Sequence, residues 1–417
     1  MKTLHFIGIG GAGMAPLAKL AIEAGFRVRG SDSALSPKAE ALRALGAEVF
    51  TGHRAEQVLP DTDLVIYSSA VGPENCERRR AAESGIAQMR RGEFLGEFVR
   101  RYKRVAAVSG SHGKSSTTAM LVTILEKCGL KPGALIGAAR LEGESALSGD
   151  GDIFVTEVDE SDGTHTCVRP FLGIVPNIDG DHEWSVGGPA ALEANFRTFG
   201  ANSENLLIAG TPELRRFYAD HPRLREAEQP DSFAGFSGFM ARNAALAVRA
   251  AELLGVPYAQ GAEAVKSYAG IERRMGVLAR RNGIIFMEDY AHHPTEVRAS
   301  IELVRRLHPG RKLHVVFQPH RYARLERFFR DFVRELKAAD KVTVLPVFAA
   351  WCEKGAVDSA ALARELPGGV FRDLPWEQLA SDLEKEAPET VVLLLGAGDI
   401  SQLAALLKNG PGPCAAQ

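Results

Sequence analysis

The chain has 417 residues, of which 45% are hydrophobic and 24% are charged, and its formal net charge is −2. This length predicts two or three domains of a globular protein, and no apolar run is long enough to span a membrane. The near-neutral charge argues against a nucleic-acid partner, because such proteins carry a clear excess of basic residues. The five cysteines are dispersed without C-x-x-C pairs. With no signal peptide at the start, this pattern favours reduced thiols and a cytoplasmic location.

The first predicted elements are a strand, a glycine-rich turn and a helix. The strand covers residues 4–9, the turn has the pattern G-x-G-x-x-G, the helix covers 14–24, and a short strand over 28–30 leads to Asp32. Glycines let backbone N–H groups approach a diphosphate at a helix N-terminus, and an acid after the second strand can bind a ribose or a base. The pattern suits NAD, FAD or a nucleotide sugar equally, or a turn without ligand. A further strand over 63–71 should border the same cleft, and residues 77–103 should form polar helices.

The central motif follows a predicted strand over 104–108 and reads SGSHGKSS over residues 109–116. Such a turn, placed before a helix expected over 117–127, presents backbone N–H groups to phosphates. In this pattern Lys114 would neutralise the β- and γ-phosphates, and the Ser115 hydroxyl would reach Mg²⁺. The first glycine of the usual eight-residue pattern is replaced by Ala107, so only the shorter G-x-x-G-K-S core is met. The arrangement predicts an ATP-using protein.

Two later strands of the central region end in polar residues. A strand over 152–158 delivers Glu157 and further carboxylates, and a strand over 172–176 is followed by Asn177 and, five residues on, His182. Carboxylates beside a triphosphate suit Mg²⁺, although a solvated acidic loop has the same composition. Taken alone, His182 reads as a surface histidine. The pattern is ragged over 204–239, and an Ala-rich helix is expected over 241–254.

A third region begins after a boundary loop over 270–274. Strands over 284–288, 312–317, 341–346 and 391–395 alternate with helices over 297–307 and 325–338, which predicts a mostly parallel, doubly wound sheet. The loops over 289–296 and 318–324 are dense in His, Tyr and Arg. Arg321 and Arg324 near a strand end could clamp a carboxylate or a phosphate. The tail over 409–417 should be frayed.

Seven motifs together resemble the Mur ligase family. They occur in the family's order and cover nearly the whole chain, from Gly8 to Gly398, and they read GIGGAGM, SGSHGKSSTT, EVDESDGT, NIDGDH, GIERRM, DYAHHPTEV and FQPHRYARL. The resemblance implies an α/β protein of three domains. These are a Rossmann-like UDP-sugar domain (1–102), a central ATP-binding domain with a P-loop ATPase-type, mostly parallel sheet (103–272), and a Rossmann-like amino-acid-binding domain (273–417).

The resemblance also implies a reaction. The lactyl carboxylate of UDP-N-acetylmuramate would attack the γ-phosphate of ATP, and the amine of L-alanine would then attack the resulting acyl phosphate, as a step of peptidoglycan precursor synthesis. The implied partners are these three small molecules with Mg²⁺ as cofactor, without nucleic acid or membrane, and the protein would be a monomer or a homodimer. Ligases for later steps use a carbamylated lysine, whereas this chain has no lysine between Pro132 and Val265, which favours alanine addition.

Roles in the family carry over onto matching positions. The implied catalytic residues are Lys114, Glu157, His182, Arg321 and Arg324, and the implied metal ligands are Ser115, Glu157 and His182. The implied ATP-binding residues are Gly110, Ser111, His112, Gly113, Lys114, Ser115, Ser116, Asn177, Asn243, Arg274 and Asp289. The UDP-sugar side would comprise Gly10, Gly11, Gly13, Met14, Asp32, His53 and Ser69, and the amino-acid side Tyr290 and His292.

Two departures from the family pattern bear on ATP binding. The usual His-Asn pair at the start of the helix that carries Asn243 is replaced by Phe239 and Met240, and the stretch over 210–238 is shorter than in relatives. Three alternatives stay open, and the missing His-Asn pair motivates the second of them. They are a ligase that recycles a tripeptide, whose acidic motif usually has Tyr at the place of Ser161, a homologue that only binds nucleotide or UDP-sugar, and a dinucleotide-dependent oxidoreductase.

Overall fold

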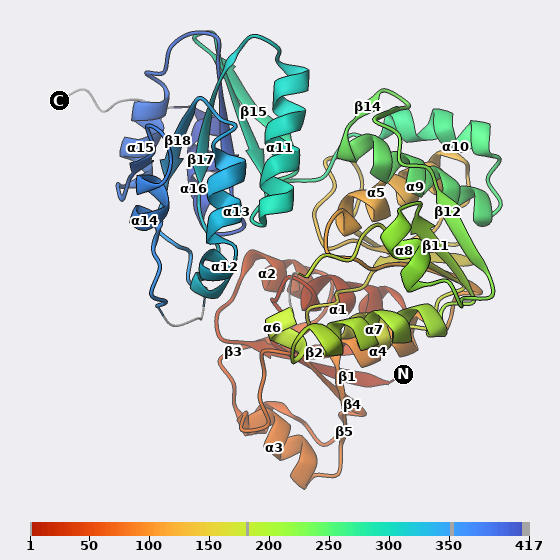
Figure 1. The fold of residues 1–417 in the computed structure, drawn as a ribbon. Coiled ribbons are helices and arrows are strands. Elements are labelled where there is room, and N and C mark those ends of the chain that lie inside the picture. Colours follow the sequence, from red (N-terminus) through yellow and green to blue (C-terminus); the bar gives the residue numbers. More distant parts are fainter. Residues whose placement is uncertain (1, 181–182, 351–353, 411–417) are drawn as a thin grey trace. The chain divides into compact units, whose positions relative to one another are not determined.

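The computed structural model describes residues 2–180, 183–350 and 354–410, and the chain forms two compact units, residues 1–269 and 270–417. The first unit contains two large sheets and a small hairpin, and the second unit contains one large sheet (Figure 1). Three mostly parallel sheets with helices confirm the predicted α/β class. The predicted boundaries after residues 102 and 272 stay predictions. Within the described ranges, no helix combines the length and the apolar character needed to cross a membrane.

The first sheet is parallel throughout, with strand order β3-β2-β1-β4-β5. Its strands are β1 (Thr3–Ile7), β2 (Arg27–Asp32), β3 (Glu48–Thr51), β4 (Leu64–Tyr67) and β5 (Ala87–Arg90). Its helices are α1 (Met14–Glu23), α2 (Pro37–Ala44), α3 (Cys76–Glu83) and α4 (Arg91–Val99). Because β1 lies in the middle of the sheet, the glycine turn that follows it lies at the centre of the carboxyl edge, where open α/β sheets bind ligands.

The second sheet has strand order β12-β11-β10-β6-β9-β7-β8 and is parallel except at its β8 edge. Its strands are β6 (Arg104–Val108), β7 (Gly133–Leu135), β8 (Ala146–Leu147), β9 (Ile153–Glu157), β10 (Leu172–Val175), β11 (Asn205–Ala209) and β12 (Leu224–Ala227). Further elements of this region are α5 (Lys114–Lys127), α6 (Glu183–Val186), α7 (Pro189–Asn202), α8 (Pro212–Phe217), the hairpin β13 (Ser232–Phe233) and β14 (Phe236–Ser237), α9 (Phe239–Leu253) and α10 (Tyr258–Ala264). Helices α5 and α9 pack side by side (Figure 1), and central β6 leads into the phosphate loop.

The first two sheets share one hydrophobic core through α4. Phe94 of this helix contacts Phe6 of β1 at a ring distance of 5.8 Å, and Phe98, one turn later, contacts Phe154 of β9 at 6.3 Å. The two phenylalanines lie four positions apart, so they share one helical face while reaching different sheets. All four rings are buried. This continuous core explains why residues 1–269 form a single compact unit.

The third sheet has strand order β15-β16-β20-β17-β18-β19, in which only β15 is antiparallel to its neighbour. Its strands are β15 (Gly276–Arg281), β16 (Ile284–Asp289), β17 (Lys312–Phe317), β18 (Lys341–Val344), β19 (Val370–Phe371) and β20 (Thr390–Leu395). Its helices are α11 (Pro294–Leu307), α12 (Tyr322–Arg327), α13 (Phe329–Leu336), α14 (Ser359–Arg364), α15 (Trp376–Leu383) and α16 (Ile400–Asn409). Separate apolar clusters join α11 and α13 to one face, and α15 and α16 to the other.

Several predicted elements differ from the observed ones. The region over 204–239, predicted as ragged, contributes β11 and β12 to the second sheet, and the helix predicted over 325–338 is two helices, α12 and α13. Helix α9 begins at Phe239, two residues earlier than predicted, because Gly238 adopts a φ of 58° that ends the preceding hairpin. The described cysteines have free thiols, as predicted. Cys352, Cys414 and most of the predicted frayed tail (411–417) lie outside the described residues.

Candidate nucleotide and ligase site

The glycine turn after β1 forms a small loop against the end of β2. Gly8 adopts a φ of 81° and donates its N–H to the Ser31 carbonyl at 2.8 Å. The Gly10 N–H donates to Asp32 Oδ2 at 2.8 Å, and α1 begins directly after Gly13. The structure therefore brings together the predicted UDP-sugar residues Gly10, Gly11, Gly13, Met14 and Asp32 at the N-terminus of a helix, where anions are favoured.

A buried carboxylate supports His53, another predicted UDP-sugar residue. Glu77 has no exposed side-chain surface, and it lies 2.7 Å from His5 Nε2 and 3.1 Å from His53 Nδ1. The Ser31 hydroxyl also donates to it, at 2.8 Å. Burial alone would raise the pKa of Glu77, but these hydrogen bonds outweigh burial and lower the pKa, so the group is ionised. An ionised carboxylate only accepts, so His53 directs Nδ1–H toward Glu77.

Glu77 was not among the predicted site residues. It stands in a stretch predicted as polar helices, at the second position of α3. Its burial arises from tertiary contacts with His5 of β1 and Ser31 of β2, which the local pattern does not reveal. A lone Glu at the start of a helix is explained by the favourable interaction of its charge with the helix dipole. The sequence carries no other signal for the role of Glu77.

The phosphate loop joins β6 to α5, as predicted from the motif. The helix begins at Lys114, three residues earlier than predicted, and Gly113 precedes it with a φ of 81°, a conformation that favours glycine. Asn177, which follows β10, closes the loop from the neighbouring strand. Its Oδ1 accepts the His112 N–H at 2.8 Å, and its Nδ2 donates to the His112 carbonyl at 2.9 Å. Ser111 Oγ accepts the Asp179 N–H at 2.8 Å. These hydrogen bonds tie the loop to the segment that follows β10.

Lys114 is charged and paired inside the loop. Its Nζ lies 2.8 Å from Glu160 Oε2 and 2.6 Å from the Gly110 carbonyl. Burial would lower the pKa of Lys114, but the carboxylates of Glu160, Asp159 and Glu157 raise it. Burial raises the pKa of Glu160 to about 7 even though the Lys114 ammonium opposes this shift. Glu160 belongs to the predicted acidic motif but was not assigned a role, and the structure makes it the carboxylate partner of the lysine.

Glu157 and Ser115 are suited to bind a divalent cation. Glu157 ends β9 beside Val108 of β6, and its buried Oε2 has no hydrogen-bond partner within the described part of the chain. An unpaired carboxylate oxygen next to a phosphate loop fits Mg²⁺, which takes one or two carboxylates together with phosphates and water. Ser115 follows Lys114 in the first turn of α5. His182, the third predicted ligand, lies outside the described residues. Across the described ranges, no cluster of three or more His, Cys, Asp or Glu side chains forms a metal site.

Asn243 lies against the phosphate loop from the other side. A Cβ at Gly113 would lie 2.9 Å from Asn243 Oδ1. The side chain is 7% exposed, and its Nδ2 has no hydrogen-bond partner in the described chain. Phe239 and Met240, which replace the family's His-Asn pair, are half-buried in the first turn of the same helix, α9. Ser116, which was also predicted, is buried in α5.

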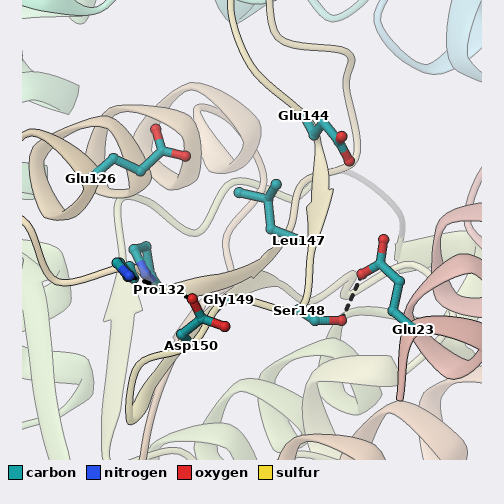
Figure 2. Close-up of a pocket in the computed structure, with 9 residues that line it drawn as sticks. Glu23, Glu126, Pro132, Glu144, Leu147, Ser148, Gly149 and Asp150 are labelled. Atoms are coloured by element: carbon teal, nitrogen blue, oxygen red, sulfur yellow. Dashed lines mark hydrogen bonds and ion pairs between the residues drawn. The ribbon is translucent and has the colours of Figure 1, made fainter. Parts of the chain in front are cut away.

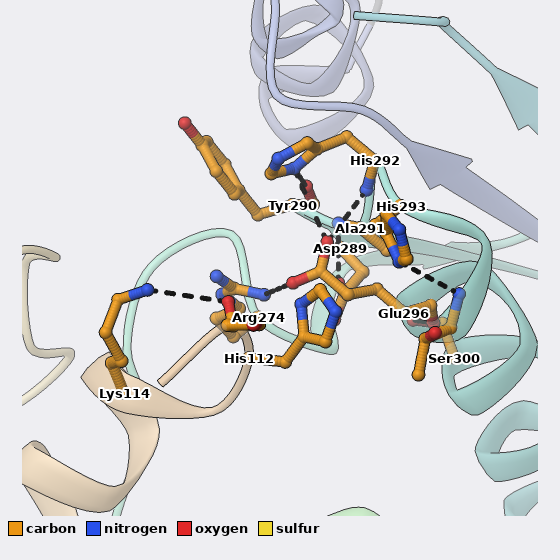
Figure 3. A network of polar contacts seen from close by, with 12 residues as sticks. His112, Lys114, Arg274, Asp289, Tyr290, Ala291, His292, His293, Glu296 and Ser300 are labelled. Atoms are coloured by element: carbon orange, nitrogen blue, oxygen red, sulfur yellow. Dashed lines mark hydrogen bonds and ion pairs between the residues drawn. The ribbon is translucent and has the colours of Figure 1, made fainter. Parts of the chain in front are cut away.

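In the second unit, Asp289 and Arg274 belong to one polar network (Figure 3). Asp289 ends β16 and accepts the N–H groups of Met275 at 2.9 Å and Ala291 at 2.8 Å. Burial raises the pKa of Asp289 to about 6, although Arg274 opposes the shift. Arg274 Nη1 donates to Glu296 Oε1 at 3.2 Å. The loop over 289–296 is thus ordered by its own carboxylates.

The predicted amino-acid residues lie in an aromatic cluster of the same unit. The Tyr290 ring lies under the guanidinium groups of Arg273 and Arg274, whose Cζ atoms are 4.9 Å and 5.1 Å from its centroid. The His292 ring is 5.3 Å from Tyr290 and 5.5 Å from His320. Cation–π contacts of this kind orient an aromatic ring. The structure therefore joins the two predicted loops, over 289–296 and 318–324, through their rings.

Arg321 and Arg324 lie at the start of α12. Arg324 is only 3% exposed, and its Nη1 lies 3.1 Å from His320 Nδ1. Arg321 precedes the helix with a φ of 68°, and its N–H donates to the Phe348 carbonyl at 2.9 Å. A non-glycine residue at such a φ stores about 1–3 kcal/mol of strain and is often found at ligand sites. The position is consistent with the predicted clamp.

A separate pocket of about 500 Å³ lies beside β8 and contains none of the predicted residues (Figure 2). It is lined by several carboxylates, but their partners belong to the chain itself. Glu126 pairs with Arg140 at 2.6 Å, and Glu23 accepts from the Ser148 hydroxyl at 2.6 Å and pairs with Lys19 at 3.1 Å. The candidate site therefore stays at the strand ends, where the predicted residues lie.

Comparison with known proteins gives consistent matches along the chain. The family description "Mur ligase family, catalytic domain" matches residues 3–103, and "Mur ligase, glutamate ligase domain" matches residues 273–398. The UDP-N-acetylmuramate–L-alanine ligase of Desulfatibacillum aliphaticivorans is 34% identical over 443 aligned positions, which cover 95% of this chain and 96% of the relative. The crystal structure of UDP-N-acetylmuramate–alanine ligase from Thermotoga maritima matches with a TM-score of 0.81 and 25% identity, over 98% of this chain and 99% of the other. A murein peptide ligase from Psychrobacter arcticus shares the fold at a TM-score of 0.71 and 21% identity, over 99% and 100% of the chains.

Proposed function

The chain belongs to the Mur ligase family, and we propose that it uses ATP to join L-alanine to the lactyl carboxylate of UDP-N-acetylmuramate. The observation that carries this proposal is the 34% identity, over nearly the whole length of both chains, to a relative named for this reaction. The ordered phosphate loop supports the use of ATP. The proposed products are UDP-N-acetylmuramoyl-L-alanine, ADP and phosphate, and the pathway is peptidoglycan precursor synthesis.

The chemistry requires activation of a carboxylate. A carboxylate oxygen of the sugar attacks the γ-phosphorus and ADP leaves; the alanine amine then attacks the acyl carbon and phosphate leaves. Phosphoryl transfer depends on positioning and charge neutralisation. Lys114, held by Glu160 and the loop carbonyls, supplies a fixed positive charge for the β- and γ-phosphates. When bound, Mg²⁺ would neutralise further charge on these oxygens, and Ser115 and Glu157 are the described residues suited to hold it.

The remaining predicted residues are assigned by substrate. We propose that ATP contacts Asn243, Asn177 and the loop over 110–116. Arg274 and Asp289, which belong to the second unit, stay predicted ATP-binding residues. The UDP-sugar binds the glycine turn with Asp32, His53 and Ser69. Arg321 and Arg324 bind the reacting carboxylate and the charge that develops on transfer, and Tyr290 and His292 contact alanine. Three further points stay predictions. They are a second metal contact from His182, a monomeric or homodimeric state, and a cytoplasmic location.

The test is phosphate release from ATP and Mg²⁺ with UDP-N-acetylmuramate, as each common amino acid is added in turn. We expect release only when the sugar and L-alanine are both present. Release with a tripeptide in place of L-alanine would reassign the protein to recycling. No release under any combination would refute the ligase and favour a homologue that only binds nucleotides.

A further inference from the structure

Arg91 extends its side chain onto the glycine turn of the first sheet. It is the first residue of α4, far from the turn in sequence, yet a Cβ placed on Gly13 would lie 2.8 Å from Arg91 Nη1 and 3.2 Å from its Cζ. A larger residue at position 13 would displace this guanidinium from its observed place. Because Gly13 immediately precedes α1, the cation lies beside the positive end of that helix, where it adds to the attraction for an anion.

Two residues of the acidic loop after β9 hold this guanidinium in place. Arg91 Nη2 donates to Asp162 Oδ2 at 2.6 Å and to Thr164 Oγ1 at 3.2 Å. Asp162 in turn accepts the Thr164 N–H through Oδ1 at 3.0 Å. With Nη2 engaged in this way, the planar geometry of the guanidinium directs Nη1 toward the glycine turn. Both side chains are only partly exposed, at 19% for Arg91 and 17% for Asp162, so the pair is largely shielded from solvent.

Backbone N–H groups of the glycine turn lie beside the Arg91 guanidinium. The Gly10 N–H is engaged by Asp32, and the Gly11 N–H by the Gly8 carbonyl. The N–H groups of Ala12 and Gly13 have no acceptor among the residues that the structure describes. Two available N–H groups at a helix start, next to a fixed guanidinium, match the needs of a phosphate or diphosphate group. Ser69, at the end of the neighbouring strand, lines the same small cavity as Arg91.

We propose that Arg91 binds the diphosphate of the UDP-sugar, and that Asp162 and Thr164 are positioning residues for it. This inference rests on the proposed function, which supplies the ligand. It has a consequence for coupling between substrates. Asp162 follows Glu160, the partner of Lys114, by two residues, so one short loop supports the cation of the diphosphate site and the lysine of the ATP site.

The test compares UDP with uridine, because only UDP carries the diphosphate. Wild type, Arg91→Ala, Arg91→Lys, Asp162→Asn and the control Arg100→Ala would be titrated with each ligand by calorimetry. Arg100 lies at the end of the same helix, is 66% exposed and pairs with Glu97, so its removal changes the net charge equally. We expect Arg91→Ala to weaken UDP binding by about 10- to 100-fold while uridine binding is unchanged.

The other variants separate charge from geometry. Arg91→Lys should lose part of this affinity, because an ammonium cannot bridge Asp162 and a phosphate with a planar fork. Asp162→Asn should weaken UDP binding in the same direction by a smaller factor, and Arg100→Ala should match wild type. If wild type binds neither ligand, the proposed UDP-sugar site itself fails. Two outcomes would refute the role of Arg91 and leave the UDP-sugar site intact. In the first, wild type and Arg91→Ala bind UDP equally well; in the second, Arg91→Ala loses affinity for UDP and for uridine by the same factor.

Discussion

Removal of the Lys114 side chain should lower both the stability of the protein and its turnover. Stability should fall because buried Glu160 loses its partner, and turnover should stop because the positive charge proposed for the phosphates is lost. The Lys114 side chain is 16% exposed, and its partner Glu160 is fully buried at a distance of 2.8 Å. Truncation of one member of a buried pair costs about 3–5 kcal/mol, because the other charge stays in a low-dielectric environment. We therefore expect Lys114→Ala to lower the free energy of unfolding by about this amount at pH 8, and to abolish phosphate release.

The pH dependence of this loss has a definite sign. Burial raises the pKa of Glu160 to about 7 in the presence of Lys114, and without the ammonium the pKa must rise further. In the variant, the folded state therefore takes up a proton that the unfolded state does not hold, so stability increases as the pH falls below the folded pKa. The destabilisation should be largest at pH 8 and smaller at pH 6.

A double variant separates the two effects. Lys114→Ala combined with Glu160→Gln removes the buried charge, and it should recover most of the lost stability without recovering turnover. Urea unfolding followed by circular dichroism at pH 8 and pH 6 measures the first quantity, and phosphate release measures the second. Wild-type stability in Lys114→Ala would contradict the buried pair. Wild-type turnover in the double variant would remove Lys114 from the reaction.

Two further predictions concern Arg324 and His165. Arg324→Ala should lower kcat by about 10²–10³-fold, the usual effect of losing a donor to developing charge, and an unchanged kcat in steady-state phosphate release would exclude it from the mechanism. Burial lowers the pKa of His165 to about 4, against an ordinary value of 6.5. As the pH falls from 6.5 to 4, the unfolded chain binds a proton on this histidine and the folded chain does not. The free energy of unfolding should therefore fall by about 3 kcal/mol over this range. His165→Phe keeps an aromatic ring packed on Phe196, whose ring is 5.2 Å from that of His165. The unfolding midpoints of this variant should lack this part of the pH dependence. A variant with the same pH profile as wild type would contradict the prediction.

The phosphate loop could be predicted from the sequence because its motif is local, although Asn177, Asp179 and Glu160, which hold it, come from distant segments. A strand, two glycines, Lys114 and a helix follow one another within a few residues, and the geometry of the loop follows from the backbone. Glu157 could be placed for a similar reason, since the last residue of a buried parallel strand must lie at the ligand edge of the sheet. For these positions, order along the chain is sufficient.

Glu77 and Arg91 could not be predicted in this way. Each stands near the start of a helix in the stretch over 77–103, which the sequence predicts as polar helices, and each acts through a contact with an element distant in sequence. Glu77 depends on His5 of β1, and Arg91 depends on Gly13 and Asp162. The two strands in the region predicted as ragged were missed for a different reason. The apolar run of β11 is only five residues long and lies within a Pro- and charge-rich stretch, so its burial is decided by pairing with β10.

The shared core of the first unit bears on the proposed phosphoryl transfer. The transfer of a phosphoryl group requires the carboxylate of one ligand to meet the terminal phosphate of another with little freedom. Phe94 and Phe98 of α4 tie the sheet of the glycine turn to the sheet of the phosphate loop, and the same helix begins with Arg91, which contacts the acidic loop. Interiors packed in this way resist relative motion of their elements. Most of the residues proposed for ATP and the UDP-sugar therefore belong to one compact unit, whereas Arg274, Asp289, Arg321, Arg324 and the residues proposed for alanine belong to the other.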